Sequence, residues 1–162
     1  MSEQFLTFRV GEAQYAVSVF RVREVLEFRE PQTLPCPDPL IAGIIRSRDA
    51  NIAVVRLREK FGLESKKCDA NTRIIVFEAN LCGRTVLFGA IVDSVQEVIE
   101  LEMAEEPPPM GNTIASRFVS GVGIRGGNYI IVLNSDLIFS IDELENINDA
   151  NEAAQKQRQG EI

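Results

Sequence analysis

The stretch Val22-Arg23-Glu24-Val25-Leu26-Glu27-Phe28 recurs in the second half of the chain as Val95-Gln96-Glu97-Val98-Ile99-Glu100-Leu101. Both copies alternate apolar and polar residues, which predicts a half-buried β-strand. The features around them recur in the same order: a proline-rich loop, then a glycine, then Ile52-Ala53-Val54-Val55 in the first half and Ile130-Ile131-Val132-Leu133 in the second. An internal repeat of this kind indicates two units of similar structure.

Each repeat contains about five short strand patterns at hairpin spacing, followed by one helical turn. In the first repeat the patterns cover residues 5–10, 15–17, 22–28, 43–45 and 52–55, with turns at Gly11 and near Asp49-Ala50-Asn51. Phe61 in the helical turn has a counterpart in Phe139. A small sheet avoids exposed edges when it closes on itself, so we expect an all-β fold of two packed five-stranded β-barrels with short helical turns.

A polar segment over residues 64–71 separates the repeats as a linker would. We therefore expect a first barrel half over residues 1–68 and a second over residues 69–147. Ser140 and Glu143 form a capping-box pattern that predicts a C-terminal helix. The apolar stripe of this helix is Leu137, Ile141, Leu144 and Ile147. Residues 148–159 contain no large apolar anchor, so a flexible tail is expected over 148–162.

Composition excludes several classes of partner. The 162 residues include 17 basic and 24 acidic side chains, giving a net charge of -7 that repels nucleic-acid phosphates and anionic lipid surfaces. No apolar run approaches the roughly 20 residues that cross a bilayer, and the N-terminus lacks the basic and then apolar pattern of a signal peptide. We expect a cytoplasmic protein without direct membrane contact.

Cysteine and histidine usage argues against catalysis and metal binding. Cys36, Cys68 and Cys82 are widely spaced and form no C-x-x-C pair, so we interpret them as reduced thiols without metal. The chain has no histidine, which removes Ser-His-Asp and Cys-His relays and His-bearing zinc sites. The sequence predicts a protein that is not an enzyme and carries no cofactor and no metal.

Two motifs have both a structural and a functional interpretation. Residues 121–126 match G-x-G-x-x-G, but turn and strand residues follow where a dinucleotide site needs a helix N-terminus, so we interpret them as part of a β-hairpin. Asp93 could act as a general base or could cap a turn before the next strand. The repeat places no basic partner or second carboxylate near Asp93, which favours the turn.

Two groups of side chains leave a choice between a structural role and partner recognition. Four arginines surround the second hairpin of the first repeat, and either a solvated face or an interface would explain them; they are Arg46, Arg48, Arg56 and Arg58. We expect the four repeat valines to lie in the barrel cores, unless an incompletely closed barrel exposes some of them to a partner; they are Val22, Val25, Val95 and Val98.

The order of these motifs resembles the CheW family from about Phe5 to Ile147. The resemblance rests on the repeat and on several segments with compatible spacing; they are Val22-Arg23-Glu24-Val25, Leu34-Pro35-Cys36-Pro37, Gly43-Ile44-Ile45-Arg46-Ser47-Arg48, Thr72-Arg73-Ile74-Ile75-Val76, Gly89-Ala90-Ile91-Val92-Asp93 and Ser120-Gly121-Val122.

The resemblance implies one CheW-like domain over residues 5–147, built from two barrels of the Src-homology-3-like type. It implies a non-catalytic chemotaxis scaffold that couples the cytoplasmic tip of chemoreceptors to the regulatory domain of the histidine kinase CheA, at receptor arrays on the inner face of the membrane. Receptor contacts of the family match Val22, Glu24, Val25, Thr72, Arg73 and Ile74. Gly43 matches a position linked to kinase binding, and Arg48 matches the arginine of the family's Asn-Leu-Arg-Gly stretch. Arg46 beside it is a further candidate for protein binding.

The chain departs from the family in the second hairpin of the first repeat. Relatives carry Asn-Leu-Arg-Gly where this chain has Arg46-Ser47-Arg48-Asp49, and Arg56 stands where an aspartate is frequent. Asp tolerates φ > 0, so the hairpin is expected to form, while partner choice stays open. The alternatives are a CheW-like module of a related pathway that binds a paralogous kinase, and a small-ligand-binding barrel or enzyme that uses Asp93 or the arginines.

Overall fold

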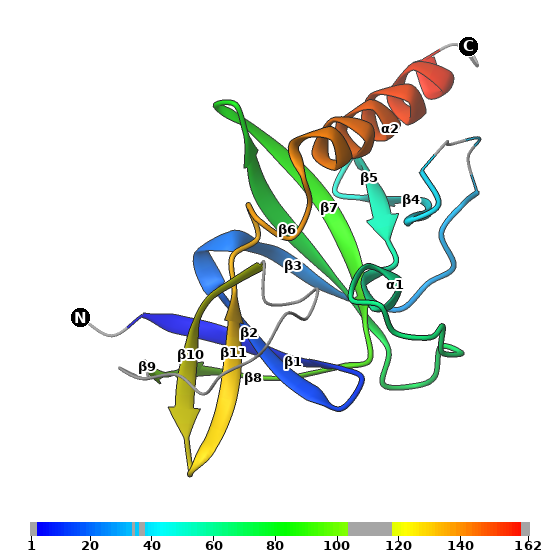
Figure 1. The fold of residues 1–162 in the computed structure, drawn as a ribbon. Coiled ribbons are helices and arrows are strands. Elements are labelled where there is room, and N and C mark those ends of the chain that lie inside the picture. Colours follow the sequence, from blue (N-terminus) through cyan, green and yellow to red (C-terminus); the bar gives the residue numbers. More distant parts are fainter. Residues whose placement is uncertain (1–2, 34, 36–37, 104–117, 160–162) are drawn as a thin grey trace.

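The computed structural model describes residues 3–33, 35, 38–103 and 118–159, and it is dominated by strands (Figure 1). The strands are β1 (Gln4–Val10), β2 (Ala13–Ser18), β3 (Val22–Glu27), β4 (Ile41–Ser47), β5 (Ala50–Val55), β6 (Arg73–Leu81), β7 (Arg84–Val92), β8 (Ser94–Glu100), β9 (Glu102–Met103), β10 (Val119–Arg125) and β11 (Asn128–Leu133). The helices are the 3-10 turn η1 (Val19–Arg21), α1 (Leu57–Lys60) and α2 (Ile141–Gln159).

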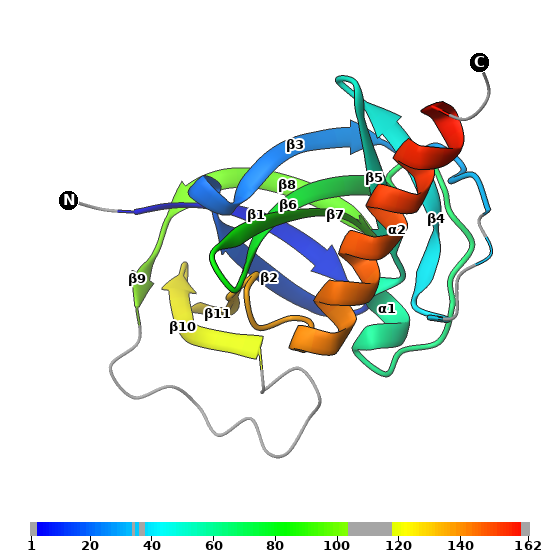
Figure 2. The same ribbon diagram turned by 90° about the horizontal axis from the view of Figure 1, so that it is seen from above.

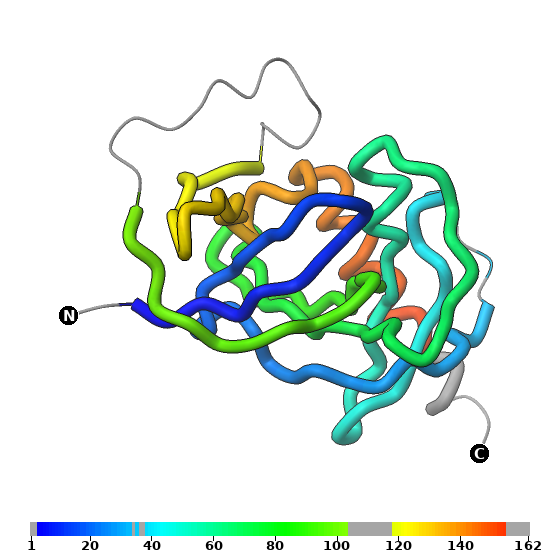
Figure 3. The backbone as a smooth tube through the Cα atoms, turned by 90° about the horizontal axis from the view of Figure 1, so that it is seen from below, coloured from blue at the N-terminus to red at the C-terminus, as the bar shows by residue number. Residues whose placement is uncertain are grey.

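The strands form two curled sheets, and each closes on itself. Barrel A is the sheet with strand order β8-β1-β2-β11-β10-β9. Its two outer strands are consecutive in the chain and meet at Leu101, so one bent strand closes the barrel by pairing with β1 at one end and with β10 at the other. In Figure 3 the tube of β8 (light green) runs alongside that of β1 (dark blue).

Barrel B is the sheet with strand order β3-β6-β7-β5-β4. It closes where Gln32, beyond the end of β3, exchanges two backbone hydrogen bonds of 2.8 Å with Ile44 of β4. The predicted pair of packed five-stranded barrels is therefore confirmed, with the bent β8–β9 strand of barrel A counted once.

Each barrel takes strands from both halves of the chain. The hairpin β1–β2 pairs with β8 and β11 in barrel A, whereas β6 and β7 pair with β3 and β5 in barrel B. The chain changes barrel at η1, because β3 leaves β2 and pairs antiparallel with β6. The boundary predicted after residue 68 lies in the irregular connection between α1 and β6, but it does not separate the two barrels.

The largest hydrophobic core lies between the barrels and includes Phe8, Tyr15, Phe77, Phe88 and Leu144. The interior of barrel A is a small cluster of Phe5, Ala16, Ile99, Ile130 and Val132. The interior of barrel B is a similar cluster of Ile45, Ile52, Val54, Ile74 and Val76. Because burying a large apolar side chain contributes about 1.5–3 kcal/mol, most of the stabilisation comes from the layer that the barrels share.

Helix α2 begins with the predicted capping box. The Ser140 N–H donates to Glu143 Oε1 at 2.9 Å, and the Glu143 N–H donates to Ser140 Oγ at 3.1 Å. The predicted apolar stripe is half right. Leu144 and Ile147 are buried, whereas Ile141, the first residue of α2, is 60% exposed, and Leu137, which precedes the helix, is 52% exposed.

The helix continues through the residues expected to be a flexible tail. Ala150 is buried, and the amide of Asn151 accepts from the Ala53 N–H at 2.6 Å and donates to the Leu87 carbonyl at 3.0 Å. Ala150 and Asn151, in the segment expected to be a flexible tail, therefore contact barrel B, and a polar residue supplies the anchor. Figures 1 and 2 both show α2 lying along barrel B beside β5.

Two hairpins form close to the turns that the sequence predicts. The β4–β5 turn is centred on Arg48 and Asp49, with φ of 50° and 65°, one residue earlier than expected. The G-x-G-x-x-G residues belong to the β10–β11 hairpin, as predicted, and its turn is Gly126-Gly127. Residues 34, 36, 37 and 107–109 of the two predicted proline loops lie outside the described residues.

Candidate functional site

The outer strand β3 of barrel B presents the first group of predicted contact residues. Val22 packs against the central core, whereas Val25 is 39% exposed. The second repeat has the same arrangement on β8, where Val95 packs against the central core and Val98 is 52% exposed. The prediction that these valines lie in the core is therefore wrong for Val25 and Val98, and each outer strand exposes one valine.

Glu24 connects β3 to the β4–β5 turn. Its carboxylate accepts a hydrogen bond from Ser47 Oγ at 2.8 Å and lies 3.5 Å from Arg48 Nε. The Glu24 side chain is 17% exposed and the Arg48 side chain is 81% exposed. An exposed ion pair contributes only about 0–1 kcal/mol, so the Ser47 bond holds Glu24 in place and the Arg48 guanidinium stays available to a partner.

Gly43 and Arg46 shape the rest of the β4–β5 hairpin. A Cβ at Gly43 would lie 2.4 Å from the Gln32 carbonyl oxygen, so a side chain there would push apart the strands that close barrel B. The Arg46 guanidinium pairs with Asp49 at 3.0 Å, and the Arg46 carbonyl accepts from Arg29 at 2.7 Å. Arg46 and Arg48 are both exposed, so the hairpin carries its basic groups at the surface.

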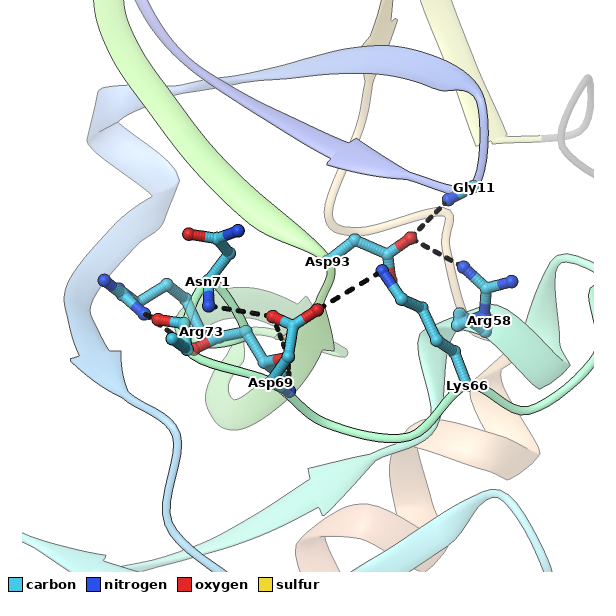
Figure 4. A network of polar contacts seen from close by, with 9 residues as sticks. Gly11, Arg58, Lys66, Asp69, Asn71, Arg73 and Asp93 are labelled. Carbon is cyan, nitrogen blue, oxygen red and sulfur yellow. Dashed lines mark hydrogen bonds and ion pairs between the residues drawn. The ribbon is translucent and has the colours of Figure 1, made fainter.

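The structure places Thr72, Arg73 and Ile74 mainly in structural roles. Thr72 is buried, and its Oγ1 accepts from the Asp69 N–H at 2.8 Å in the turn before β6. Arg73 donates to the carbonyls of Ala70 and Thr72, as Figure 4 shows for the surrounding network. Ile74 is fully buried in barrel B. Direct contact with a partner is available to Arg73 but not to the side chains of Thr72 and Ile74.

Asp93 has a basic partner that the repeat did not predict. Its Oδ2 accepts from Arg58 Nη1 at 2.6 Å and from the Gly11 N–H at 2.8 Å (Figure 4). Both side chains are mostly buried, at 20% exposed for Arg58 and 15% for Asp93. Arg58 approaches from α1, on barrel B, and Gly11 from the first turn of barrel A. Asp93 therefore ties the two barrels together, and its carboxylate is occupied by this contact.

Phe20 is an exposed residue that the sequence patterns did not indicate. It lies on η1 directly before β3 and is 79% exposed. It borders an open cleft of about 350 Å³ together with Met103, which is 43% exposed. A large aromatic in a three-residue connection between strands was the available signal. The chain thus exposes a large apolar side chain directly before β3.

Within residues 3–33, 35, 38–103 and 118–159, no three His, Cys, Asp or Glu side chains gather as metal ligands would. Burial, reinforced by Glu30, Asp69 and Asp93, raises the pKa of the Cys68 thiol and favours its neutral form. None of the helices in the described part of the chain is long and apolar enough to span a membrane.

Comparison with known proteins identifies the family. The model of the CheW-like domain matches residues 4–143. The chemotaxis protein CheW of Treponema pallidum (strain Nichols) is 26% identical over 146 residues, covering 89% of this chain and 86% of that protein. CheW of Bacillus subtilis (strain 168) is 31% identical over 110 residues, covering 67% of this chain and 68% of that protein.

A solved structure is similar over the same region. The crystal structure of the scaffolding protein TtCheW from Thermoanaerobacter tengcongensis superposes with a TM-score of 0.73 at 31% identity, covering 86% of this chain and 94% of that one. Sequence and fold agree over the two barrels and their shared core, and the chain belongs to the CheW family.

Proposed function

We propose that this chain is a non-catalytic coupling adaptor of chemotaxis that joins the cytoplasmic tip of chemoreceptors to the CheW-like regulatory domain of the kinase CheA. One observation carries the proposal: Glu24 connects an exposed apolar strand to an exposed basic turn. Val25 lies on the strand and Arg48 on the turn, and Glu24 contacts Ser47 and Arg48 from the strand. Two chemically different surfaces are therefore held in a fixed relation.

The apolar surface of β3 suits the receptor tip. Val25 and Phe20 are exposed, and Val22 and Arg73 lie beside them on β3 and its neighbour β6. Apolar residues surrounded by charged groups are typical of interface centres. Thr72 and Ile74 would act through the position of β6.

The β4–β5 turn suits the kinase domain. Gly43 fixes the path of the strand, and Arg46 and Arg48 present guanidinium groups at the surface. The departure from Asn-Leu-Arg-Gly at residues 46–49 changes the charge of this turn, so we place the choice between kinase paralogues here. The adaptor would work in the cytoplasm, recruited to receptor arrays, where many weak contacts add up through multivalency.

The test is a binding assay with the kinase regulatory domain and a receptor cytoplasmic fragment, each added separately. Arg48→Glu should weaken kinase binding about tenfold or more, whereas Arg84→Glu, the same charge reversal on an exposed residue of β7, should leave it unchanged. Val25→Lys should weaken receptor binding, with Thr85→Lys as its control. Circular dichroism spectra should stay unchanged in all four variants.

Binding of neither partner by the unaltered chain would refute the proposal. Equal kinase affinity of the Arg48→Glu and Arg84→Glu variants would show that the basic turn is only a solvated surface.

A further inference from the structure

Barrel B closes at a seam between β4 and the segment that follows β3. Among the described residues, the two bonds between Gln32 and Ile44 are the only backbone hydrogen bonds across this seam. Alternate residues of a strand turn their backbone groups to the same edge, so Arg46 presents its carbonyl to the seam as Ile44 does. A continued antiparallel ladder would place Glu30 opposite Arg46. Instead, the Arg29 guanidinium donates to the Arg46 carbonyl at 2.7 Å.

The hairpin of barrel A that corresponds to β4–β5 is β10–β11. The two pairing registers follow the same steps, with an irregularity beside Gly43 in one hairpin and beside Gly121 in the other. Three residues beyond these glycines lie Arg46 and Ile124, which are therefore equivalent positions of the two barrels.

Barrel A closes at the equivalent place with backbone pairing. Arg29 and Glu102 lie two residues beyond the ends of the repeated strands β3 and β8, so they too are equivalent positions. In barrel A, Ile124 and Glu102 are register partners in the ladder between β10 and β9. In barrel B, the Arg29 side chain bonds to Arg46 where barrel A has this ladder step. Arg29 thus replaces a backbone contact that closes the other barrel.

The turn end of the β4–β5 hairpin is consequently joined to β3 through side chains. Within the described part of the chain, Ser47 Oγ donates to the Glu24 carboxylate at 2.8 Å, and Arg29 bonds to the Arg46 carbonyl. The ion pair of Arg48 with Glu24 adds little, because the Arg48 side chain is 81% exposed. Arg29 and Ser47 are therefore the contacts that fix the turn relative to β3.

The turn has a backbone conformation that depends on such contacts. Its two central residues, Arg48 and Asp49, have φ of 50° and 65°. Residues other than glycine seldom adopt positive φ, and asparagine and aspartate tolerate it better than arginine does. A conformation of this kind persists where the surrounding structure holds it in place.

We propose that Arg29 is a positioning residue for the β4–β5 turn: its bond to the Arg46 carbonyl holds the turn in the conformation that the kinase regulatory domain binds. The inference rests on the proposed function, in which this turn is the kinase contact. Without the bond, the kinase has to order the turn when it binds. Ordering the backbone of about one residue corresponds to roughly a fivefold loss of affinity.

Two measurements on the full chain test this role. The first is the affinity for the kinase regulatory domain, and the second is amide hydrogen exchange over residues 46–51 in the free chain. Arg29→Met should weaken binding about fivefold and accelerate exchange in the turn by a similar factor. Arg29 is exposed, so its replacement leaves the core and the urea unfolding midpoint nearly unchanged. The matched control is Arg23→Met, which removes an exposed arginine of β3 that bonds to Glu78 on the side away from the seam.

The control should change neither measurement. Unchanged kinase affinity in Arg29→Met would overturn the inference. Weaker binding with unchanged exchange in the turn would also overturn it, because Arg29 would then contact the kinase itself. If the unaltered chain does not bind the kinase, the proposed function fails, while exchange in the free chain still shows whether Arg29 holds the turn.

Discussion

Asn151 provides the sharpest test of how α2 is held, because its side chain takes the place of a step in a β-ladder. β5 and β7 pair in parallel at Val54 with Gly89 and at Val55 with Ala90. One step earlier, the Ala53 N–H and the Leu87 carbonyl would face each other in a continued ladder. The Asn151 amide lies between them and bonds to both. Barrel A needs no such residue, since Ile131 pairs directly with Tyr15 at the corresponding step.

Asn151→Ala leaves both backbone groups without their partner. An unpaired buried donor or acceptor costs about 1–3 kcal/mol. Because Asn151 is only half-buried, water can reach the gap, and the low end of the range applies to each group, for a total of about 2 kcal/mol. The better helix propensity of Ala returns about 0.5 kcal/mol. The net loss should be about 1.5 kcal/mol, which corresponds to roughly 3–6 °C in Tm for a chain of this size.

Urea unfolding followed by circular dichroism measures this loss, and amide hydrogen exchange locates it. Exchange at Ala53 should accelerate in the variant, because its N–H loses its acceptor. Asn148→Ala is the matched control: Asn148 lies one turn earlier in α2 and bonds to Glu152 of the same helix at 3.4 Å. Asn151→Asp should be worse than Asn151→Ala, since a carboxylate would face the Leu87 carbonyl. If Asn151→Ala costs no more than Asn148→Ala, the ladder interpretation is refuted.

Three further predictions concern the closure and joining of the barrels. Gly43→Ala should lower the free energy of unfolding in urea by more than about 2 kcal/mol, because the new Cβ would meet the backbone of Gln32. Gly121→Ala should lower it less, because the Cβ there would meet only the flexible end of the Met103 side chain. Equal decreases in the two variants would contradict this account. Asp93→Asn should lower the free energy of unfolding by about 3 kcal/mol, because it leaves Arg58 without a charged partner. The double variant Asp93→Leu with Arg58→Met should recover part of this stability. A double variant that is no more stable than Asp93→Asn would argue against the ion pair. Burial raises the pKa of Glu143, but hydrogen bonds from Lys60 and Ser140 and the charge of Lys60 outweigh it and lower that pKa below 4.5. Glu143 should therefore stabilise the fold above that pH, and this stabilisation should be lost as pH falls through the folded pKa. The measurement is the difference between the urea unfolding midpoints at neutral and acid pH. Lys60→Met should make this difference smaller.

The fold was predictable from the sequence because the repeat duplicates strand patterns, turns and a glycine in one order. Alternation in residues 22–28 and 95–101 correctly predicts β3 and β8. The exchange of strands between the barrels was not predictable, because alternation shows which side of a strand is buried but not which strand lies beside it. Alternation would be the same if each strand paired only with strands of its own repeat. It is also the same in the observed structure, where strands of the two repeats pair with each other.

The polar anchors were missed for a related reason. Asn151 lies in a segment without large apolar residues, so hydrophobic periodicity gives no signal for it. Thr7 behaves similarly: its buried hydroxyl donates to the Glu97 carbonyl at 2.9 Å and accepts from the Glu97 N–H at 3.1 Å, where β1 and β8 shift register. Side chains that complete backbone hydrogen bonding are recognisable only when the two strands are in place. The same holds for Asp93, whose partner Arg58 is distant in the chain.

The β4–β5 and β10–β11 hairpins differ in the chemistry of their turn ends. The β4–β5 turn is charged, with Arg46, Arg48 and Asp49, whereas the end of the β10–β11 face is apolar, with Ile124 and Tyr129. Contacts through exposed charges weaken as salt screens them, and contacts through apolar surface do not. Kinase binding at the β4–β5 turn should thus fall with ionic strength. Because the helix after β11 returns to barrel B and covers the first hairpin, the repeat yields two hairpins of one plan with different surfaces.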